Sequence, residues 1–288
     1  MTLKIKDLHP ILASEIEGFD PTSFDQDTLD LLRETFDERA VLVFRDLDLD
    51  GGDQSRIVEL LYDREARADD PDIGYRDATF QCVSNKLPDG GAPYGRLLFH
   101  ADMMWSTIPE QIPSLYALEV EQPSVPTLFV STTHAWDTLP DDLKERVAGL
   151  HARHESGRQG RGDEEYKDEL LQPHWDKLRD TVTLVANPHP RTGKIMLYVC
   201  EQQTREIVEL PEDESNALLD RLFEHLYQPE QMYSHQWQER DFVIWDNQAT
   251  QHGRPFVVAQ GPARTLRKVH APRAELLQVG SIAYDRAS

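Results

Sequence analysis

The feature that most constrains the fold of this sequence is a series of short runs rich in β-branched, aromatic and other apolar residues, spread between residues 40 and 270. Such runs are too short for helices with a buried face, and Gly, Pro, Asn and Asp residues separate them, which is typical of strands joined by turns. Many short strands with few long helices between them favour a sandwich or barrel over a repeating βαβ fold. The predicted strands are residues 40–44, 79–84, 114–120, 127–131, 181–186, 195–200, 242–245 and 264–270.

Three segments show the apolar spacing of amphipathic helices instead. One carries Leu29, Leu32 and Phe36, a second starts at Pro140, and a third follows Pro211 and its acidic neighbours, which suit a helix N-terminus. No internal repeat or linker divides the chain. We therefore expect a single domain over residues 1–288, mostly β with flanking helices.

Composition excludes several classes of partner. The 288 residues are 39% hydrophobic, enough for a sizeable core, and carry a formal net charge of -22. Nucleic acid and anionic membranes need clustered cations, so neither is an expected partner. No apolar run approaches the roughly 20 residues that cross a bilayer, and the first residues lack the apolar core of a secretory signal. We expect a cytoplasmic protein whose two cysteines, Cys82 and Cys200, are buried and reduced.

A candidate metal ligand pair lies in the segment FHADMMW. In an extended chain, side chains two residues apart point to the same face, so His100 and Asp102 would converge on one point. The same spacing occurs in His174 and Asp176, but that pair lies in a polar stretch with helix-like features, where residues two apart diverge. We therefore interpret the second pair as surface.

The third candidate ligand is His252, which follows an apolar strand and a turn-like Asp246-Asn247 pair. Two imidazoles and one carboxylate on one face of an octahedral ion leave three positions open, as in non-haem iron(II) oxygenases. Two open positions suit a 2-oxo acid and one suits O₂. The fold would have to bring His252 to the distant pair.

A cluster of basic residues follows in this otherwise acidic chain: Arg264, Arg267, Lys268 and Arg273. Guanidinium groups match carboxylates in bidentate fashion. In an extended strand, Arg264 and Lys268 share one face and Arg267 takes the other. Only some residues of this cluster can therefore face one pocket.

Three other segments have simpler interpretations. Residues 46–59 resemble the first half of a calcium loop, but Ile57 stands where the bidentate Glu is needed, so calcium binding is not expected. Residues 87–95 and 155–169 are polar and Gly-punctuated, and we interpret both as loops. Either an active-site lid or an ordinary surface loop fits them.

The ligands, their order and their contexts resemble the taurine dioxygenase and TfdA-like family of 2-oxoglutarate-dependent oxygenases. The resemblance covers most of the chain, through residues 12–49, FHADMMW, residues 121–140, DFVIWDNQATQHGRPF and the basic strand. It implies a double-stranded β-helix, that is, a jelly-roll barrel. It also implies the site residues: His100, Asp102 and His252 as iron ligands, Thr127 and Arg264 for the 2-oxoglutarate carboxylate, and Arg267 as the reserve choice.

The implied enzyme uses iron(II), 2-oxoglutarate and O₂, and hydroxylates a small or medium, anionic organic substrate with release of succinate and CO₂. Residues 53–94 contain no His, and Lys268 stands where the taurine enzymes have an Arg; both departures speak against taurine itself. The residues predicted to meet the substrate are Lys268, Arg96, Tyr94, Met103, Met104 and Trp105.

Two alternatives stay open. One is the same cofactor chemistry in a biosynthetic pathway, as desaturation or epimerisation of a larger substrate. The other is a non-catalytic jelly-roll protein that binds a metal for structure only. Members of the family are commonly dimers or tetramers, so we expect a homo-oligomer.

Overall fold

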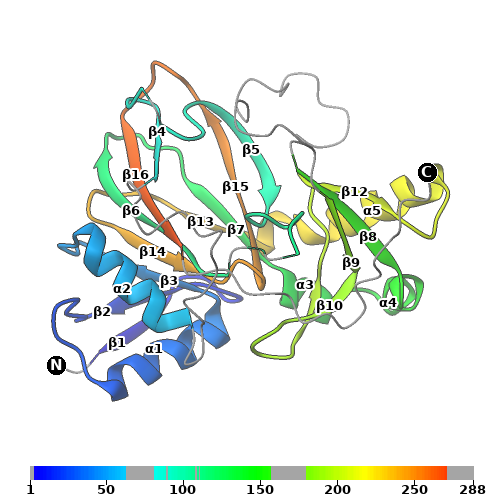
Figure 1. The fold of residues 1–288 in the computed structure, drawn as a ribbon, viewed down its shortest axis with the longest axis horizontal. Coiled ribbons are helices and arrows are strands. Elements are labelled where there is room, and N and C mark those ends of the chain that lie inside the picture. The colour runs from blue at the N-terminus through cyan, green and yellow to red at the C-terminus, as the bar shows by residue number, and fades with distance from the viewer. Residues whose placement is uncertain are drawn as a thin grey trace.

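The computed structural model describes residues 3–62, 81–88, 90–107, 109, 111–156 and 180–270. Within these residues the chain is mostly β, with two larger sheets, two smaller ones and five α-helices (Figure 1). The larger sheets carry the site described below. No helix in the described ranges combines the length and apolar character needed to cross a membrane.

The largest sheet has seven strands, and its centre is the most apolar part of the sequence. Residues 41–44 and 242–245 pair antiparallel along their whole length. Every one of these residues is buried, because both faces of the sheet are covered. In spatial order the strands are β1 (Lys4–Asp7), β2 (Ser14–Glu17), β3 (Val41–Phe44), β14 (Phe242–Trp245), β6 (Pro113–Val120), β16 (Arg264–His270) and β4 (Gln81–Ser84).

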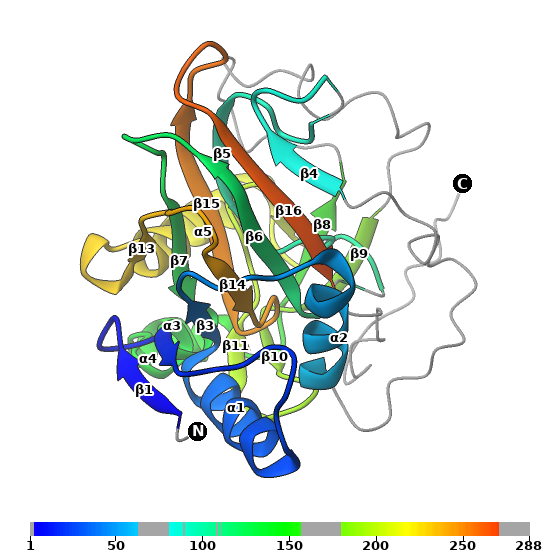
Figure 2. The same ribbon diagram turned by 90° about the vertical axis from the view of Figure 1, so that its left-hand side faces the viewer.

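The second sheet lies behind the first when the molecule is seen as in Figure 2. Its four strands are β13 (Tyr233–His235), β7 (Thr127–Ser131), β15 (Thr250–Val257) and β5 (Gly95–His100), in that order. Alternate residues of the large sheet, among them Val43, Val243 and Leu266, pack against Phe129 of the second sheet. The side chains between the two sheets therefore form an apolar core. The polar residues of the site lie toward the ends of the strands that border this core.

Helices α1 (Gln26–Arg39) and α2 (Gly51–Tyr62) cover the other face of the large sheet. They pack on the side chains that alternate with the inner ones, such as Phe44 and Phe242. Helix α1 begins where the Asp25 side chain accepts a hydrogen bond from the backbone of Thr28, as an N-cap residue does.

A second, smaller group of elements packs around the long amphipathic helix α5 (Glu212–Leu226), which buries Leu218, Leu219 and Leu222. Figure 1 shows this group on the side of the molecule away from α1 and α2. Besides α5 it contains α3 (Thr132–Asp137), α4 (Asp141–Val147), the sheet β12 (Thr204–Ile207), β8 (His151–Glu155) and β9 (Asp180–Leu184), the pair β10 (Ala186–Pro188) and β11 (Ile195–Leu197), and the short 3₁₀ turn Pro229–Gln231.

The three predicted helices and the eight predicted strand runs all contain regular structure, with two changes. The run 181–186 divides at Val185 into β9 and β10, and the run 195–200 is a strand only to Leu197. Helix α2 was not predicted: the segment that resembles a calcium loop caps a helix instead, since the Asp50 side chain accepts from the backbone of Asp53. Most of the predicted loop 155–169 lies outside the described residues. Cys82 and Cys200 are free thiols, but only Cys200 is buried as predicted, whereas Cys82 is half-buried on β4.

Candidate metal centre

The two strands that carry the candidate histidines are neighbours. β5 and β15 pair antiparallel, and their register places His252 directly opposite His100. Opposite residues of an antiparallel pair project from the same face of the sheet, and the two ring centroids are 4.3 Å apart. Two residues separated by 152 positions in the chain thus form one cross-strand pair.

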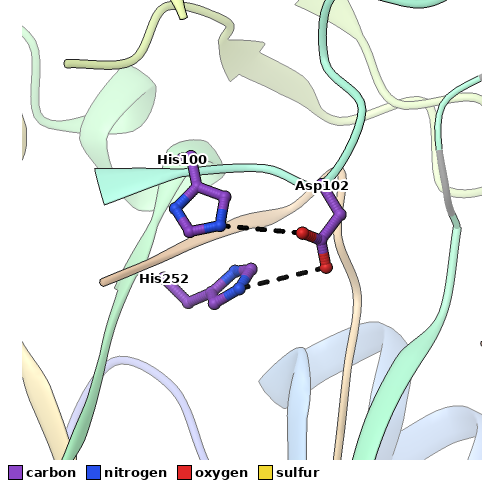
Figure 3. A group of neighbouring side chains, drawn as sticks. All are labelled: His100, Asp102 and His252. Atoms are coloured by element: carbon purple, nitrogen blue, oxygen red, sulfur yellow. Dashed lines mark ion pairs between the residues drawn. The ribbon is translucent and has the colours of Figure 1, made fainter. Parts of the chain in front are cut away.

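Asp102 completes the group, although not in the way that the sequence predicted. β5 ends at His100, so Asp102 lies in the turn beyond the strand instead of on an extended segment. Its carboxylate nevertheless faces both rings, with Oδ1 3.6 Å from His100 Nε2 and Oδ2 3.9 Å from His252 Nε2 (Figure 3). One ligand atom from each of the three residues lies within 4.8 Å of the others.

The contacts and charges of the three side chains suit metal binding. His100 Nδ1 donates to the carbonyl of Leu98 over 2.8 Å, and Nε2 is the ring nitrogen that faces the centre. Burial, aided by the nearby His100, lowers the pKa of His252 to about 3, which keeps its imidazole neutral at neutral pH. Burial alone would raise the pKa of Asp102, but Lys268 and then the two histidines hold it well below the ordinary value. Two neutral imidazoles and one carboxylate are the donor set predicted for iron(II).

Lys268 lies beside this group, at the inner face of β16. Its Nζ is 3.0 Å from Asp102 Oδ2, and both side chains are only 16% exposed. As predicted, Lys268 and Arg264 share one face of β16: Lys268 contacts Asp102, and Arg264 contacts Thr127 of β7. An ammonium group has three N–H donors and no acceptor, so Lys268 suits an anionic partner.

Arg264 lies deeper between the sheets. Its Nη2 donates to Thr127 Oγ1 over 3.2 Å, and Trp237 Nε1 donates to the same oxygen over 3.0 Å. Burial, with a smaller effect of Arg254, lowers the pKa of Arg264 to about 9. No carboxylate in the described ranges pairs with this guanidinium, and its Nε is buried without a hydrogen-bond partner. A buried cation with spare donors is a binding site for an anion.

Arg267, the reserve choice, faces the other way. Its guanidinium donates to the Gln54 side chain and to the carbonyl of Leu49, both over 2.7 Å, and lies 4.8 Å from the centroid of the Tyr116 ring. These contacts join the large sheet to α2. The alternation along β16 therefore separates the two arginines as predicted, and it leaves Arg264 as the one facing Thr127.

The other predicted substrate residues lie in varied surroundings. Arg96 is paired with Glu201 at 4.0 Å, and Tyr94 is 38% exposed. Met104 is fully buried in a cluster with Ala101, Met196, Tyr198 and Cys200, which favours a role in packing. Trp105 is also buried, and Met103 has a positive φ of 57°.

Three residues of the site had no predicted role: Trp237, Arg254 and Asn247. Trp237 orients the Thr127 hydroxyl, and Arg254 donates to the carbonyls of Ala92 and Tyr94 before β5 and of Gly95, its first residue. Asn247 contacts the backbone of Asp102. The turn-like Asp246-Asn247 pair marked the last of these, but only the fold reveals which residue its amide meets. The competing pair His174 and Asp176 lies outside the described residues.

Comparison with known proteins identifies a family that matches most of the chain. The family described as "Taurine catabolism dioxygenase TauD, TfdA family" matches residues 4–270. Pentalenolactone F synthase of Streptomyces avermitilis is 32% identical over 205 residues, which cover 65% of this chain and 66% of the relative. The match thus spans just under two thirds of that relative's length.

Other similarities extend over more of the chain. The alpha-ketoglutarate-dependent 2,4-dichlorophenoxyacetate dioxygenase of Burkholderia sp. strain RASC is 26% identical over 280 residues, 90% of this chain and 91% of the relative. The crystal structure of AAD-2 in complex with Mn(II) and N-oxalylglycine has a TM-score of 0.74 at 25% identity and covers 96% of this chain and 99% of its own.

Proposed function

Since this chain belongs to the TauD/TfdA family of dioxygenases, we propose that it is an iron(II)- and 2-oxoglutarate-dependent dioxygenase that hydroxylates a small or medium, anionic organic substrate. The observation that supports this proposal above all is the arrangement of two cations around the candidate ligands. Lys268 lies beside the His100, Asp102 and His252 group. Arg264 is buried, with a donor nitrogen that has no hydrogen-bond partner and no counter-ion in the described part of the chain.

His100, Asp102 and His252 would hold the iron through the two Nε2 atoms and the carboxylate. Among the described residues, no fourth His, Cys, Asp or Glu joins this group, so protein donors would leave coordination positions open. When bound, iron(II) with 2-oxoglutarate and O₂ supplies the oxidising chemistry, and succinate, CO₂ and the oxidised substrate are the products. The protein's part is to hold the reactants in order and to keep competing groups away.

Arg264 and Thr127 would bind the carboxylate of 2-oxoglutarate that is remote from the metal. The Thr127 hydroxyl already accepts from Arg264 and Trp237, so its own hydrogen can be donated to a carboxylate oxygen. An anion there would also offset the burial of the guanidinium. Arg267 is not proposed for this role, because its donors serve Gln54 and Leu49.

Lys268 would bind the anionic group of the substrate while it remains near Asp102. This is consistent with the relative that acts on 2,4-dichlorophenoxyacetate, which carries a carboxylate. Arg96, Tyr94, Met103, Met104 and Trp105 remain candidates for the rest of the substrate pocket. The two facing sheets support assignment of a jelly-roll (double-stranded β-helix) fold, in one domain over residues 1–288.

A spectroscopic titration tests the cofactor part of this proposal. Iron(II) and 2-oxoglutarate are added to the metal-free protein without oxygen, and the visible charge-transfer band of the chelate is recorded. We expect the band in the wild-type protein and not in Asp102→Ala. Absence of the band in the wild type at saturating iron(II) would contradict the proposal.

A turnover screen tests the substrate class. Succinate release is measured with aryloxy acids, alkyl sulfonates, alkyl sulfates and amino acids, each with a neutral ester or amide as the matched control. We expect release with at least one anion and much less with its neutral counterpart. Equal release from both would contradict a role for Lys268 in binding the charge.

A second candidate function rests on the similarity to pentalenolactone F synthase. It is the same cofactor chemistry acting on a larger substrate in a biosynthetic pathway, with desaturation or epimerisation as the outcome. Succinate release without added substrate, together with no oxidation of any of the anions tested, would favour it. The non-catalytic alternative is set aside, because the family to which the chain belongs is enzymatic.

A further inference from the structure

The backbone of Asp102 lies beyond the end of its strand. β5 ends at His100, so the amide and carbonyl of Asp102 no longer take part in the ladder with β15. Buried backbone groups without a partner destabilise a fold, so the structure has to supply other partners for them. The next residue, Met103, has a positive φ of 57°, which turns the chain sharply here.

A single side chain supplies both partners. The Asp102 N–H donates to Asn247 Oδ1 over 2.8 Å, and Asn247 Nδ2 donates to the Asp102 carbonyl over 2.9 Å. Donor and acceptor of one carboxamide thus meet acceptor and donor of one residue, as two paired strand residues would. Two parallel hydrogen bonds fix the rotation of Asp102 as well as its position, which one bond would not.

Asn247 is itself held firmly. It is fully buried, and its backbone N–H donates to the carbonyl of Gln111 over 3.0 Å. The preceding residue, Asp246, accepts from the backbone of Gln248 and Ala249 and donates to the carbonyl of Ala40. The carboxamide is therefore anchored in a turn with little freedom to follow a displaced Asp102.

The same turn leads into β15, which starts at Thr250 and carries His252. Asn247 consequently links the Asp102 backbone to the strand of the distal histidine by a short, hydrogen-bonded segment. His100 reaches the same strand through the β5–β15 ladder. The position of each of the three candidate ligands is thus fixed relative to β15.

From this geometry we infer that Asn247 is a positioning residue for the metal ligand Asp102, an inference that rests on the proposed function. Without the carboxamide, the turn that carries Asp102 loses the contacts that aim its carboxylate at the two imidazoles. Partners of metal ligands typically change metal affinity by about 10–100-fold when they are removed. We expect a loss in that range from Asn247→Ala.

The test measures metal binding without turnover. Cobalt(II) is titrated into the metal-free protein by calorimetry, and the visible absorption of the bound ion is recorded. Asn247→Ala is compared with Asn85→Ala, because Asn85 makes a matching pair of bonds: it accepts from the Arg264 N–H over 3.0 Å and donates to the Pro262 carbonyl over 2.9 Å. Melting of each metal-free protein reports general damage to the fold.

We expect Asn247→Ala to weaken cobalt(II) binding about tenfold or more and to alter the cobalt(II) spectrum, while Asn85→Ala changes neither. Asn247→Leu keeps the branched shape of the side chain and loses both bonds, so it gives the same result if the alanine variant does not fold. Affinity within threefold of the wild type and an unchanged spectrum in the folded variant would overturn the inference. So would an equal loss of affinity in Asn85→Ala.

The outcome for the wild type separates this inference from the function on which it rests. If wild-type protein binds cobalt(II) and Asp102→Ala does not, the metal centre stands whatever the Asn247 variants do. If wild type and Asp102→Ala bind equally, the proposed centre itself is wrong.

Discussion

The candidate site and the charge network of Asp246, His189 and Arg191 both lie largely within the protein, but they differ in how far their polar atoms are bonded to other protein groups. Asp246, in the network, accepts from His189 Nε2 over 3.1 Å, from Arg191 and from two backbone amides. In the site, Arg264 Nε is buried without a hydrogen-bond partner. Groups that stabilise a fold are paired within it, whereas groups that serve a ligand keep capacity for it.

The electrostatics follow the same division. Burial alone would raise the pKa of Asp246, but His189 and Arg191 hold it well below its ordinary value. Arg191 also pairs with Asp37 of α1, so the network ties the turn before β15 to the helix that covers the large sheet. For Arg264, burial is opposed by no carboxylate in the described ranges, and its pKa falls. Substitutions in the network should therefore cost stability, and substitutions in the centre should cost function.

The largest expected effect is on turnover, from Asp102→Ala. The variant loses the carboxylate that faces both imidazoles, so we expect it to abolish metal-dependent succinate release while the metal-free protein still folds. Asp176→Ala is the matched control, since it removes the Asp of the other His-x-Asp pair, and it should leave turnover nearly intact. Equal losses in the two variants would mean that the wrong pair has been chosen.

The next effect is on stability, from Asp246→Ala. Removing one partner of a buried ion pair leaves the other charges unpaired, which typically costs about 3–5 kcal/mol. We expect a loss of that size in the free energy of unfolding, measured by denaturant titration of the metal-free protein. Asp142→Ala removes a carboxylate from an exposed pair with Arg221 and should leave stability unchanged. Equal changes in the free energy of unfolding for Asp246→Ala and Asp142→Ala would contradict a stabilising role specific to the buried network.

A smaller effect distinguishes the two arginines of β16. Hydrogen bonds to a charged group contribute about 1.5–3 kcal/mol, so Arg264→Ala should raise the apparent KM for 2-oxoglutarate about 10- to 150-fold. Its stability without metal should change little, because the guanidinium has no carboxylate partner in the described part of the chain. Arg267→Ala should do the reverse and lower stability without changing KM, because it loses the contacts with Gln54 and Leu49. If Arg267→Ala raises KM instead, the assignment of the two faces is wrong.

Local sequence patterns predicted the central strands of the fold well, because residues such as those of β3 are apolar on both faces and need no partner to be recognised. They missed β5 and β15, the two strands that carry the histidines. Both contain Gly, Arg and His, and their pairing is irregular, with register shifts between His252, Arg254 and Val257. Strands whose side chains serve a site lack the apolar alternation by which strands are found.

The candidate site was predicted unevenly for a similar reason. The side chains of His100 and Asp102 converge, but through a turn held by Asn247 and not through the strand alternation that their spacing suggested. The contact of Lys268 with Asp102 joins residues 166 positions apart, and the bond from Trp237 to Thr127 joins residues 110 apart. Such contacts depend on how the two sheets face each other, which no local pattern specifies.

The smallest effect tests a buried histidine that resembles His252 in pKa but differs in its partners. Burial lowers the pKa of His154 to about 3, and its two ring nitrogens lie 3.0 and 2.9 Å from the hydroxyls of Thr204 and Thr183. Because this pKa is below that of the unfolded chain, about 6.5, the unfolded state binds the extra proton between these values. Stability contributed by the neutral ring is therefore present above about pH 6.5 and is lost as pH falls toward 3.

Denaturant titrations of wild type and His154→Gln measure this loss. Glutamine can still bond to both threonines but does not titrate, so between about pH 7.5 and about pH 5 the wild type should lose about 2 kcal/mol more than the variant. Cobalt(II) should not change this difference, because His154 has partners within the protein and no vacant nitrogen for a metal. If both proteins lose stability in parallel, the His154 ring is protonated in the folded state. Burial alone would then not keep a partnered histidine neutral, and a neutral His252 would require the nearby charges of His100 and Lys268 as well.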